Sequence, residues 1–197
     1  MRARRTEDIE RSRAAIDQAL EIIGHGIANL RALITDLRPA SLDELGPEPA
    51  LSALVTRCRA HTGLEIALDV DLAYEQGRTP NRHTPDLELV IYRLVQEALN
   101  NVAKHAHAKA VRVRVVEHDA ERAVLVEVHD DGRGFDPSDA SEGFGLVGMR
   151  ERVAAVGGSV AVESSPGEGT RLWARLPVTR RDSASDGKRV ASSSFGS

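Results

Sequence analysis

The sequence is poor in cysteine and in aromatic residues, and each shortage excludes a class of structure. Cys58 is its one cysteine, so the chain can form no internal disulfide and fits a reducing compartment. Aromatic residues make up only 3% of the chain, so a core must be built mainly from Leu, Val, Ile and Ala. We therefore expect a cytoplasmic globular protein rather than a disulfide-stabilised secreted one.

Long apolar runs and an excess of positive charge are also missing. No apolar segment approaches the roughly 20 residues of a membrane helix, and no signal peptide follows the arginine-rich start. The formal net charge of −4 gives no electrostatic reason to expect nucleic acid or an anionic membrane as a partner. The sequence predicts neither partner for this chain, although a longer parent protein could carry a membrane sensor.

A heptad pattern runs through residues 6–38, which we predict to form one long helix. Pro39 ends it, because the residue before a proline disfavours helix. A seam this narrow needs another helix to cover it, and the prediction is a bundle or coiled coil that makes the chain a homodimer. A helix packed on its own domain is the alternative. The seam residues are spaced alternately by four and three positions: Ile16, Leu20, Ile23, Ile27, Leu30, Ile34 and Leu37.

The sequence predicts a single α+β domain at residues 47–178, and it predicts a linker at residues 39–49. Hairpin-linked strands and separate helices favour a two-layer α/β sandwich, with one mixed sheet and helices on one face. Thr84 and Pro85 are predicted to be the cap and first position of its central helix. Residues 179–197 are expected to form a disordered tail. The predicted helices are 47–61, 84–105 and 146–156, and the predicted strands are 64–70, 110–117, 123–129, 159–163 and 170–176.

The predicted central helix carries a polar segment, EALNN, at residues 97–101. Glu97 and Asn101 are four residues apart and share one helix face, with Lys104 and Lys109 just beyond. A carboxylate, an amide oxygen and nearby cations could hold a metal ion and the phosphates that it bridges. A solvated polar face is the alternative when this segment is taken alone.

Three further segments are rich in glycine. In DDGRGF, at residues 130–135, the glycines permit a tight turn close to a ligand, and Asp130 can accept a hydrogen bond from an amino group. GFGLVGM, at residues 143–149, precedes a helix and offers backbone N–H groups to phosphate, but it fits neither a Walker nor a Rossmann pattern. SSPGEGT, at residues 164–170, can place the Thr170 hydroxyl near a nucleotide. A tight acidic turn and an ordinary hairpin are the alternatives for the first and last segments.

Taken in this order, the four segments resemble the ATP-binding domain shared by histidine kinases, type II topoisomerases, mismatch-repair ATPases and a heat-shock chaperone. GFGLVGMRER, at residues 143–152, and LITDLRP, at residues 33–39, are typical of sensor histidine kinases whose response regulators carry a helix-turn-helix output domain. The resemblance extends over about residues 9–177. It implies ATP and Mg²⁺ as cofactors and such a regulator as the partner.

The resemblance also implies a role for each motif residue. Asn101 resembles the Mg²⁺ ligand, Glu97 the catalytic acidic residue of the same box, and Asp130 the aspartate that receives the adenine amino group. Lys104 and His105 resemble residues that contact phosphate. The other binding residues shape the adenine pocket (Gly132, Gly134), form the lid over the phosphates (Gly143, Gly145, Leu146, Gly148) or lie near adenine (Thr170).

One feature of the family is missing from this sequence. The family's phosphoacceptor histidine lies in a Glu-Leu-His-Asp-like sequence on a first dimerisation helix, and no such sequence occurs here. His25 lies instead between Gly24 and Gly26, without an acidic neighbour. The seam helix resembles the second helix of that bundle, so we expect the acceptor histidine to lie outside this chain. This chain alone is then not expected to autophosphorylate.

The sequence therefore predicts the catalytic, ATP-binding portion of a two-component sensor histidine kinase. Such a protein-histidine kinase transfers the ATP γ-phosphate to a histidine for relay to a response regulator. The alternatives are an anti-sigma-factor-like serine/threonine kinase and a non-catalytic module that binds nucleotide and dimerises.

Overall fold

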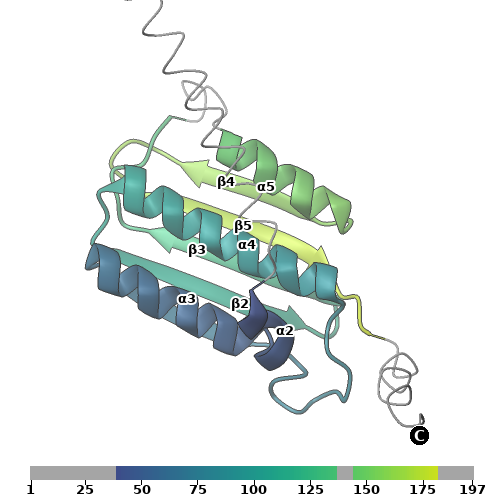
Figure 1. Ribbon diagram of the computed structural model, residues 1–197. Coiled ribbons are helices and arrows are strands. Elements are labelled where there is room, and N and C mark those ends of the chain that lie inside the picture. Colours follow the sequence, from purple (N-terminus) through teal and green to yellow (C-terminus); the bar gives the residue numbers. More distant parts are fainter. Residues whose placement is uncertain (1–38, 137–143, 182–197) are drawn as a thin grey trace, which may run out of the picture. The chain divides into compact units, whose positions relative to one another are not determined.

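The computed structural model describes residues 39–136 and 144–181 (Figure 1). The described residues from Ala40 onward belong to one compact unit. The predicted seam helix, Gly143 and residues 182–197 lie outside the described residues. The predictions made for those segments therefore remain predictions.

A five-stranded mixed sheet forms one layer of the domain, with the strand order β1-β2-β3-β5-β4. β1 (Glu65–Asp71) runs parallel to β2 (Ala110–His118). β3 (Ala123–Asp130), β5 (Thr170–Pro177) and β4 (Ser159–Ser164) follow in antiparallel pairs. Every second side chain of β2 and β3 is buried, as the alternation of valine with polar residues predicts.

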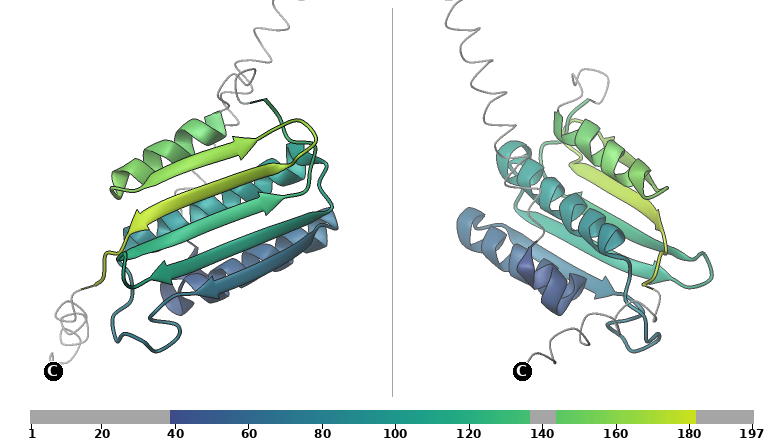
Figure 2. Two further views of the ribbon diagram at one scale, coloured as in Figure 1. Left: turned by 180° about the vertical axis from the view of Figure 1, so that it is seen from behind. Right: turned by 45° about the vertical axis from the view of Figure 1, so that its right-hand side comes forward.

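Three helices form the second layer: α3 (Pro47–Thr62), α4 (Pro85–Asn101) and α5 (Phe144–Ala155). All three lie on one face of the sheet, and the strands come to the front when the domain is seen from behind (Figure 2). α4 lies between the other two helices, so Ile91, Leu94 and Val95 are at most 1% exposed. The predicted two-layer α/β sandwich is thus confirmed, and α4 is its central element.

The predicted linker at residues 39–49 is wrong, because a short helix, α2 (Ala40–Leu45), lies within it. Leu42 of α2 is fully buried. The Arg82 guanidinium donates hydrogen bonds to the carbonyl oxygens of Leu42, at 2.9 Å, and Asp43, at 3.1 Å. The compact domain therefore begins before the predicted residue 47.

The predicted start of the disordered tail at residue 179 is also wrong. The backbone N–H of Thr84 donates to the carbonyl oxygen of Thr179 at 2.9 Å, and that of Arg181 donates to Arg82 at the same distance. The Thr84 side chain makes no helix-capping hydrogen bond, and its hydroxyl lies 2.8 Å from that of Thr179. These contacts bind the chain to the domain as far as Arg181.

The C-terminal end of the central helix differs from the predicted regular helix. After Asn101 the chain continues as a π-helical turn, η1 (Val102–Ala106). His107 then adopts a left-handed backbone conformation with φ of 52°, which ends the helix. Wide turns of this kind occur often at functional sites, and this one carries Lys104 and His105.

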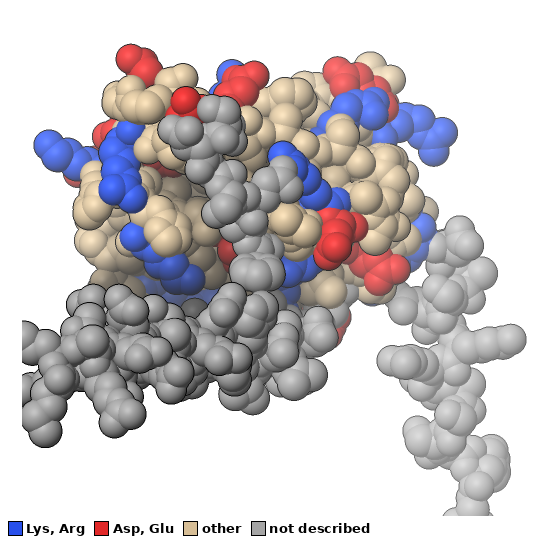
Figure 3. Space-filling view, turned by 90° about the horizontal axis from the view of Figure 1, so that it is seen from above, with Lys and Arg blue, Asp and Glu red and all other residues tan. Residues whose placement is uncertain are grey.

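Among the described residues, no helix has both the length and the apolar character needed to cross a bilayer. Seen from above, the described part of the domain carries basic and acidic side chains interspersed over its surface, without one large field of a single sign (Figure 3).

Candidate functional site

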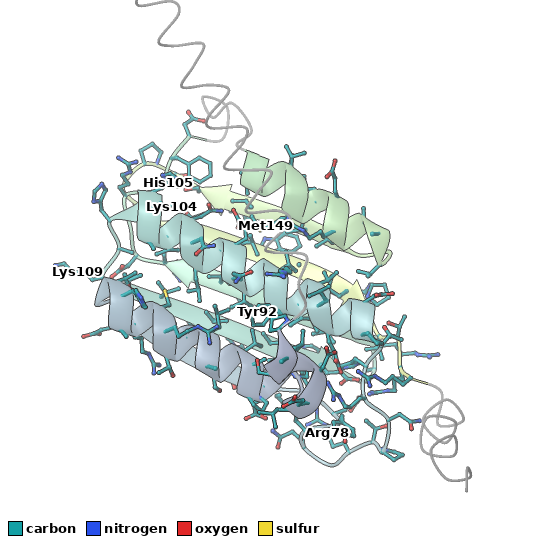
Figure 4. All side chains as sticks on the ribbon, viewed as in Figure 1. Arg78, Tyr92, Lys104, His105, Lys109 and Met149 are labelled. Atoms are coloured by element: carbon teal, nitrogen blue, oxygen red, sulfur yellow. The ribbon has the colours of Figure 1, made fainter. Side chains whose placement is uncertain are left out.

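A cavity of about 560 Å³ opens beside α4, where η1, α5 and the ends of β3 and β5 meet. Lys104 and His105 lie at the C-terminal end of α4, and Met149 lies between α4 and α5 (Figure 4). An apolar hollow with a few polar groups is the usual form of a small-molecule site. Its apolar wall includes Ala98, Val102, Ala106, Val128, Leu146, Met149, Val162 and Leu172, and its polar side chains are Glu97, Asn101, Lys104, His105, Asp130, Arg133 and Thr170.

Asp130 is the buried acid of this cavity, with 4% of its surface exposed. It ends β3, and its Oδ1 accepts a hydrogen bond of 2.9 Å from the backbone N–H of Gly132. Burial raises the pKa of Asp130 above its ordinary value, although hydrogen bonds from the backbone N–H groups of Gly132 and Thr170 act in the opposite direction. The result is a fixed acceptor group in an otherwise apolar wall.

Glycine is required in the loop that follows Asp130. A Cβ on Gly132 would lie 2.5 Å from the carbonyl oxygen of Ala106, and one on Gly134 would lie 2.0 Å from that of Ser165. Gly134 also has a φ of +59°, which glycine adopts without strain. The loop is therefore held tightly between η1 and the β4–β5 turn.

The β4–β5 turn is joined to this loop through Ser164. Its hydroxyl donates to the carbonyl oxygen of Gly169 at 2.8 Å and accepts a hydrogen bond of 3.0 Å from the Phe135 backbone. It also lies 3.1 Å from the hydroxyl of Thr170. The predicted residue Thr170 is thus positioned by Ser164, which the sequence analysis did not single out.

Glu97 and Asn101 approach the first turn of α5 from α4. A Cβ added to Gly145 would lie 2.5 Å from Oε1 of Glu97 and 3.7 Å from Nδ2 of Asn101. A carboxylate and a carboxamide offer the oxygen ligands that Mg²⁺ prefers. The donor set at this end of the cavity therefore fits a magnesium ion shared with phosphate oxygens.

The structure brings most of the predicted binding residues together at this cavity. Gly132 does not line the cavity, but its backbone N–H donates a hydrogen bond to Asp130, which does. Gly148 does not line it, and a Cβ there would lie 3.3 Å from a guanidinium nitrogen of Arg152. Gly143 is outside the described residues. The predicted residues that line the cavity are Glu97, Asn101, Lys104, His105, Asp130, Gly134, Gly145, Leu146 and Thr170.

The chain is similar to known proteins in sequence. Residues 86–180 match the family described as histidine kinase-, DNA gyrase B- and HSP90-like ATPase. The signal transduction histidine-protein kinase/phosphatase DegS of Brevibacillus brevis is 36% identical over 175 residues, which cover 85% of this chain and 43% of DegS. UhpB of Salmonella typhimurium, described in the same words, is 36% identical over 162 residues, which cover 81% of this chain and 30% of UhpB. The chain thus spans less than half the length of either relative.

Solved structures of histidine kinases share the fold. The histidine kinase domain of the blue-light activated kinase EL346 from Erythrobacter litoralis superposes with a TM-score of 0.54 at 23% identity, covering 65% of this chain and 59% of that one. Full-length ShkA in complex with AMPPNP gives a TM-score of 0.52 at 22% identity, covering 68% of this chain and 30% of ShkA. At this level of identity the likeness concerns the fold alone.

Proposed function

We propose that this chain binds ATP in the cavity beside α4 as a phosphoryl donor. The match of residues 86–180 to the histidine kinase-, DNA gyrase B- and HSP90-like ATPase family and the similarity to DegS and UhpB support the proposal. The activity proposed is that of a protein-histidine kinase.

The buried Asp130 is the observation that carries the proposal. An acceptor fixed in an apolar wall suits a flat aromatic base with an exocyclic amino group, which is the character of adenine. A base lacking that donor would leave the buried carboxylate with only its backbone hydrogen bonds and would cost binding free energy. Thr170 lies opposite Asp130 in the β3–β5 pairing, so it would contact the same base.

The opposite end of the cavity suits the phosphates. We assign Asn101 as the Mg²⁺ ligand and Glu97 as the acidic residue nearest the reacting group. Bound Mg²⁺ would neutralise charge that develops on the phosphoryl oxygens. Lys104 and His105 would contact the phosphates from η1.

The start of α5 would lie over the same phosphates. Its backbone N–H groups, around Gly145 and Leu146, offer positive partial charge at a helix N-terminus. From the sequence alone, we also assign Gly143 to this lid over the phosphates.

For the whole protein we propose transfer of the γ-phosphate to a histidine outside this chain, followed by relay to a response regulator with a helix-turn-helix output domain. Both relatives bear names of histidine-protein kinases, which favours this reading over an anti-sigma-factor-like kinase or a non-catalytic module. A homodimer through residues 6–38 and a cytoplasmic site of action complete the proposal.

Calorimetric titration of the chain with Mg–ATP tests the base assignment. The change Asp130→Asn turns an acceptor into a partial donor facing the adenine amino group, and we expect affinity to fall about tenfold or more. The matched control is Asp131→Asn, because the exposed Asp131 side chain accepts hydrogen bonds from Lys109 and Ala110 outside the cavity. Equal affinity in wild type and Asp130→Asn would refute the assignment of Asp130 to the base.

A further inference from the structure

Arg133 is the one residue with a side chain between the two glycines of the loop after β3. Its backbone is fixed on both sides: the N–H donates to the carbonyl oxygen of Ala106 at 2.8 Å, and the carbonyl oxygen accepts a hydrogen bond of 2.6 Å from Gly167. The first bond ties Arg133 to the last residue of η1, directly after Lys104 and His105. The fold therefore holds Arg133 at the cavity, beside the two basic residues of η1.

The two acidic residues that precede Arg133 accept hydrogen bonds from backbone groups. Asp130 is buried and accepts a hydrogen bond from Gly132. Asp131 accepts hydrogen bonds from the backbone N–H groups of Lys109 and Ala110, at 2.8 and 2.9 Å, and these bonds lower its pKa. Within the part of the chain that the structure describes, no carboxylate pairs with the Arg133 guanidinium.

We propose that Arg133 is a phosphate-anchoring residue, which holds the phosphate chain of the nucleotide from the loop after β3. The proposal rests on the proposed function, since it needs a nucleotide in the cavity. A guanidinium offers several N–H donors in one plane and binds phosphate oxygens in pairs. Arg133 would thereby add to Lys104 and His105 a cation supplied by a second segment of the chain.

The base end of the cavity is a poorer place for this guanidinium. Adenine already has its acceptor in Asp130, and the wall beside it is made of apolar side chains such as Val128 and Leu172. Arg133 is exposed, so its side chain can turn toward an anion at the cavity mouth without being buried. Its effect on binding should accordingly depend on the charge of the ligand rather than on the base.

The test compares ligands of different charge on variants of the full chain. We would titrate wild type, Arg133→Glu and Arg133→Lys with Mg–ATP, ADP and adenosine, following displacement of a fluorescent ATP analogue. Arg112→Glu is the matched control, because Arg112 is an exposed arginine of β2 that does not line the cavity. The Arg112→Glu variant changes the net charge by the same amount as Arg133→Glu, but it leaves the cavity unaltered.

We expect Arg133→Glu to weaken ATP and ADP about tenfold or more and to leave adenosine unchanged. Arg133→Lys should retain most of the ATP affinity, and Arg112→Glu should match wild type. Wild-type ATP affinity in Arg133→Glu, or an equal loss for adenosine, would overturn the inference while leaving the proposed function intact. Failure of the folded wild-type chain to bind ATP at all would instead refute the proposed function. Circular dichroism would establish that each variant is folded.

Discussion

At the scale of single residues, the cavity separates two chemical tasks. Asp130 is buried among apolar side chains, where one directed hydrogen bond discriminates strongly between ligands. Glu97 and Asn101 are partly exposed, and they lie where a hydrated cation and phosphates can enter. The apolar wall therefore suits selection of the base, and the polar end suits the reacting phosphates.

The magnesium assignment predicts a specific effect of Asn101→Ala. Removing the carboxamide takes away the proposed ligand, so affinity for ATP in the presence of Mg²⁺ should fall by about tenfold or more. In excess chelator, wild type and variant should bind ATP equally, because the ion is then absent from both. Calorimetry measures each case, with Asn100→Ala as the control, since the neighbouring Asn100 is exposed and does not line the cavity. Equal losses with and without Mg²⁺ would argue against a metal ligand at Asn101.

We predict that the stability of the domain depends on pH because of the buried His83, a residue outside the cavity. It is 1% exposed and its Nε2 lies 3.2 Å from Oε2 of Glu117. Burial lowers the pKa of His83, an effect that Glu117 opposes and Arg180 reinforces. Below the ordinary pKa of histidine the unfolded chain therefore binds more protons than the folded chain, so the free energy of unfolding falls as the pH falls.

We expect His83→Gln to reduce this loss of stability between about pH 7.5 and pH 5.5. His118→Gln, a change at an exposed histidine of β2, should keep the pH dependence of wild type. Urea unfolding at both pH values measures the difference. If His83→Gln and wild type lose equal stability over this range, then His83 is not the responsible group.

The sequence could identify the polar residues of the site but not its wall. Glu97, Asn101 and Asp130 are identified because their segments occur in the order found in the ATP-binding domain that the sequence resembles, whereas each segment alone has an ordinary alternative. Met149 and Leu172 follow the ordinary apolar pattern of a helix and a strand, so nothing distinguishes them from core residues. The sequence does not single out Arg133, because the glycines on both sides of it indicate a constraint on backbone geometry and not a binding side chain.

At the scale of elements, α4 connects two polar regions at opposite ends of the domain. Its C-terminal half carries Glu97 and Asn101, and its first turns carry Glu88, which is fully buried. Arg82 donates to both carboxylate oxygens of Glu88, at 2.9 and 2.8 Å, while it also binds the carbonyl oxygens of α2. One arginine thus holds α2 against the start of the central helix.

Arg82→Ala should strongly destabilise the domain. It leaves the buried Glu88 without its bidentate partner, although Arg181 lies 3.4 Å from Glu88 and compensates in part. Breaking a buried pair of this kind costs about 3–5 kcal/mol. Urea unfolding measures the loss, and Arg78→Ala is the control because the Arg78–Asp71 pair is exposed. We expect the control to unfold like wild type, and equal stability of Arg82→Ala and Arg78→Ala would contradict the role given to Arg82.

The errors in predicting elements share a physical cause. The helices and strands that carry a full apolar period were predicted to within a few residues. The six-residue helix α2 is too short to show such a period, and its single fully buried side chain, Leu42, is ordered by contacts with distant residues. Thr84 was predicted to cap α4 through its hydroxyl, but a tertiary contact with Thr179 takes that group instead. Local patterns do not encode contacts of this range.

At the scale of the whole molecule, the seam of residues 6–38 remains a sequence-based prediction of a dimer. Burying one aliphatic side chain contributes about 1.5–3 kcal/mol, so seven in a stripe exceed the entropic cost of association. We expect Ile23→Asp with Leu30→Asp to make the chain monomeric while ATP binding persists. The control is Gln18→Asp with Asn29→Asp, which alters polar positions beside the seam.

Sedimentation at tens of micromolar decides the oligomeric state. Wild type and the control should sediment as dimers and the seam variant as a monomer. A wild-type chain that sediments as a monomer would show that the seam is covered within its own chain, which is the alternative that the sequence left open.

The location of ATP in the domain is the central claim, and hydrogen exchange of the full chain with and without Mg–ATP tests it most directly. The claim predicts slower exchange in peptides from residues 101–106, 130–136 and 144–149, which surround the cavity. Peptides from residues 39–46 and 81–84, at the opposite end of α4, should be unchanged. Slower exchange at that opposite end, with none around the cavity at saturating Mg–ATP, would contradict the account.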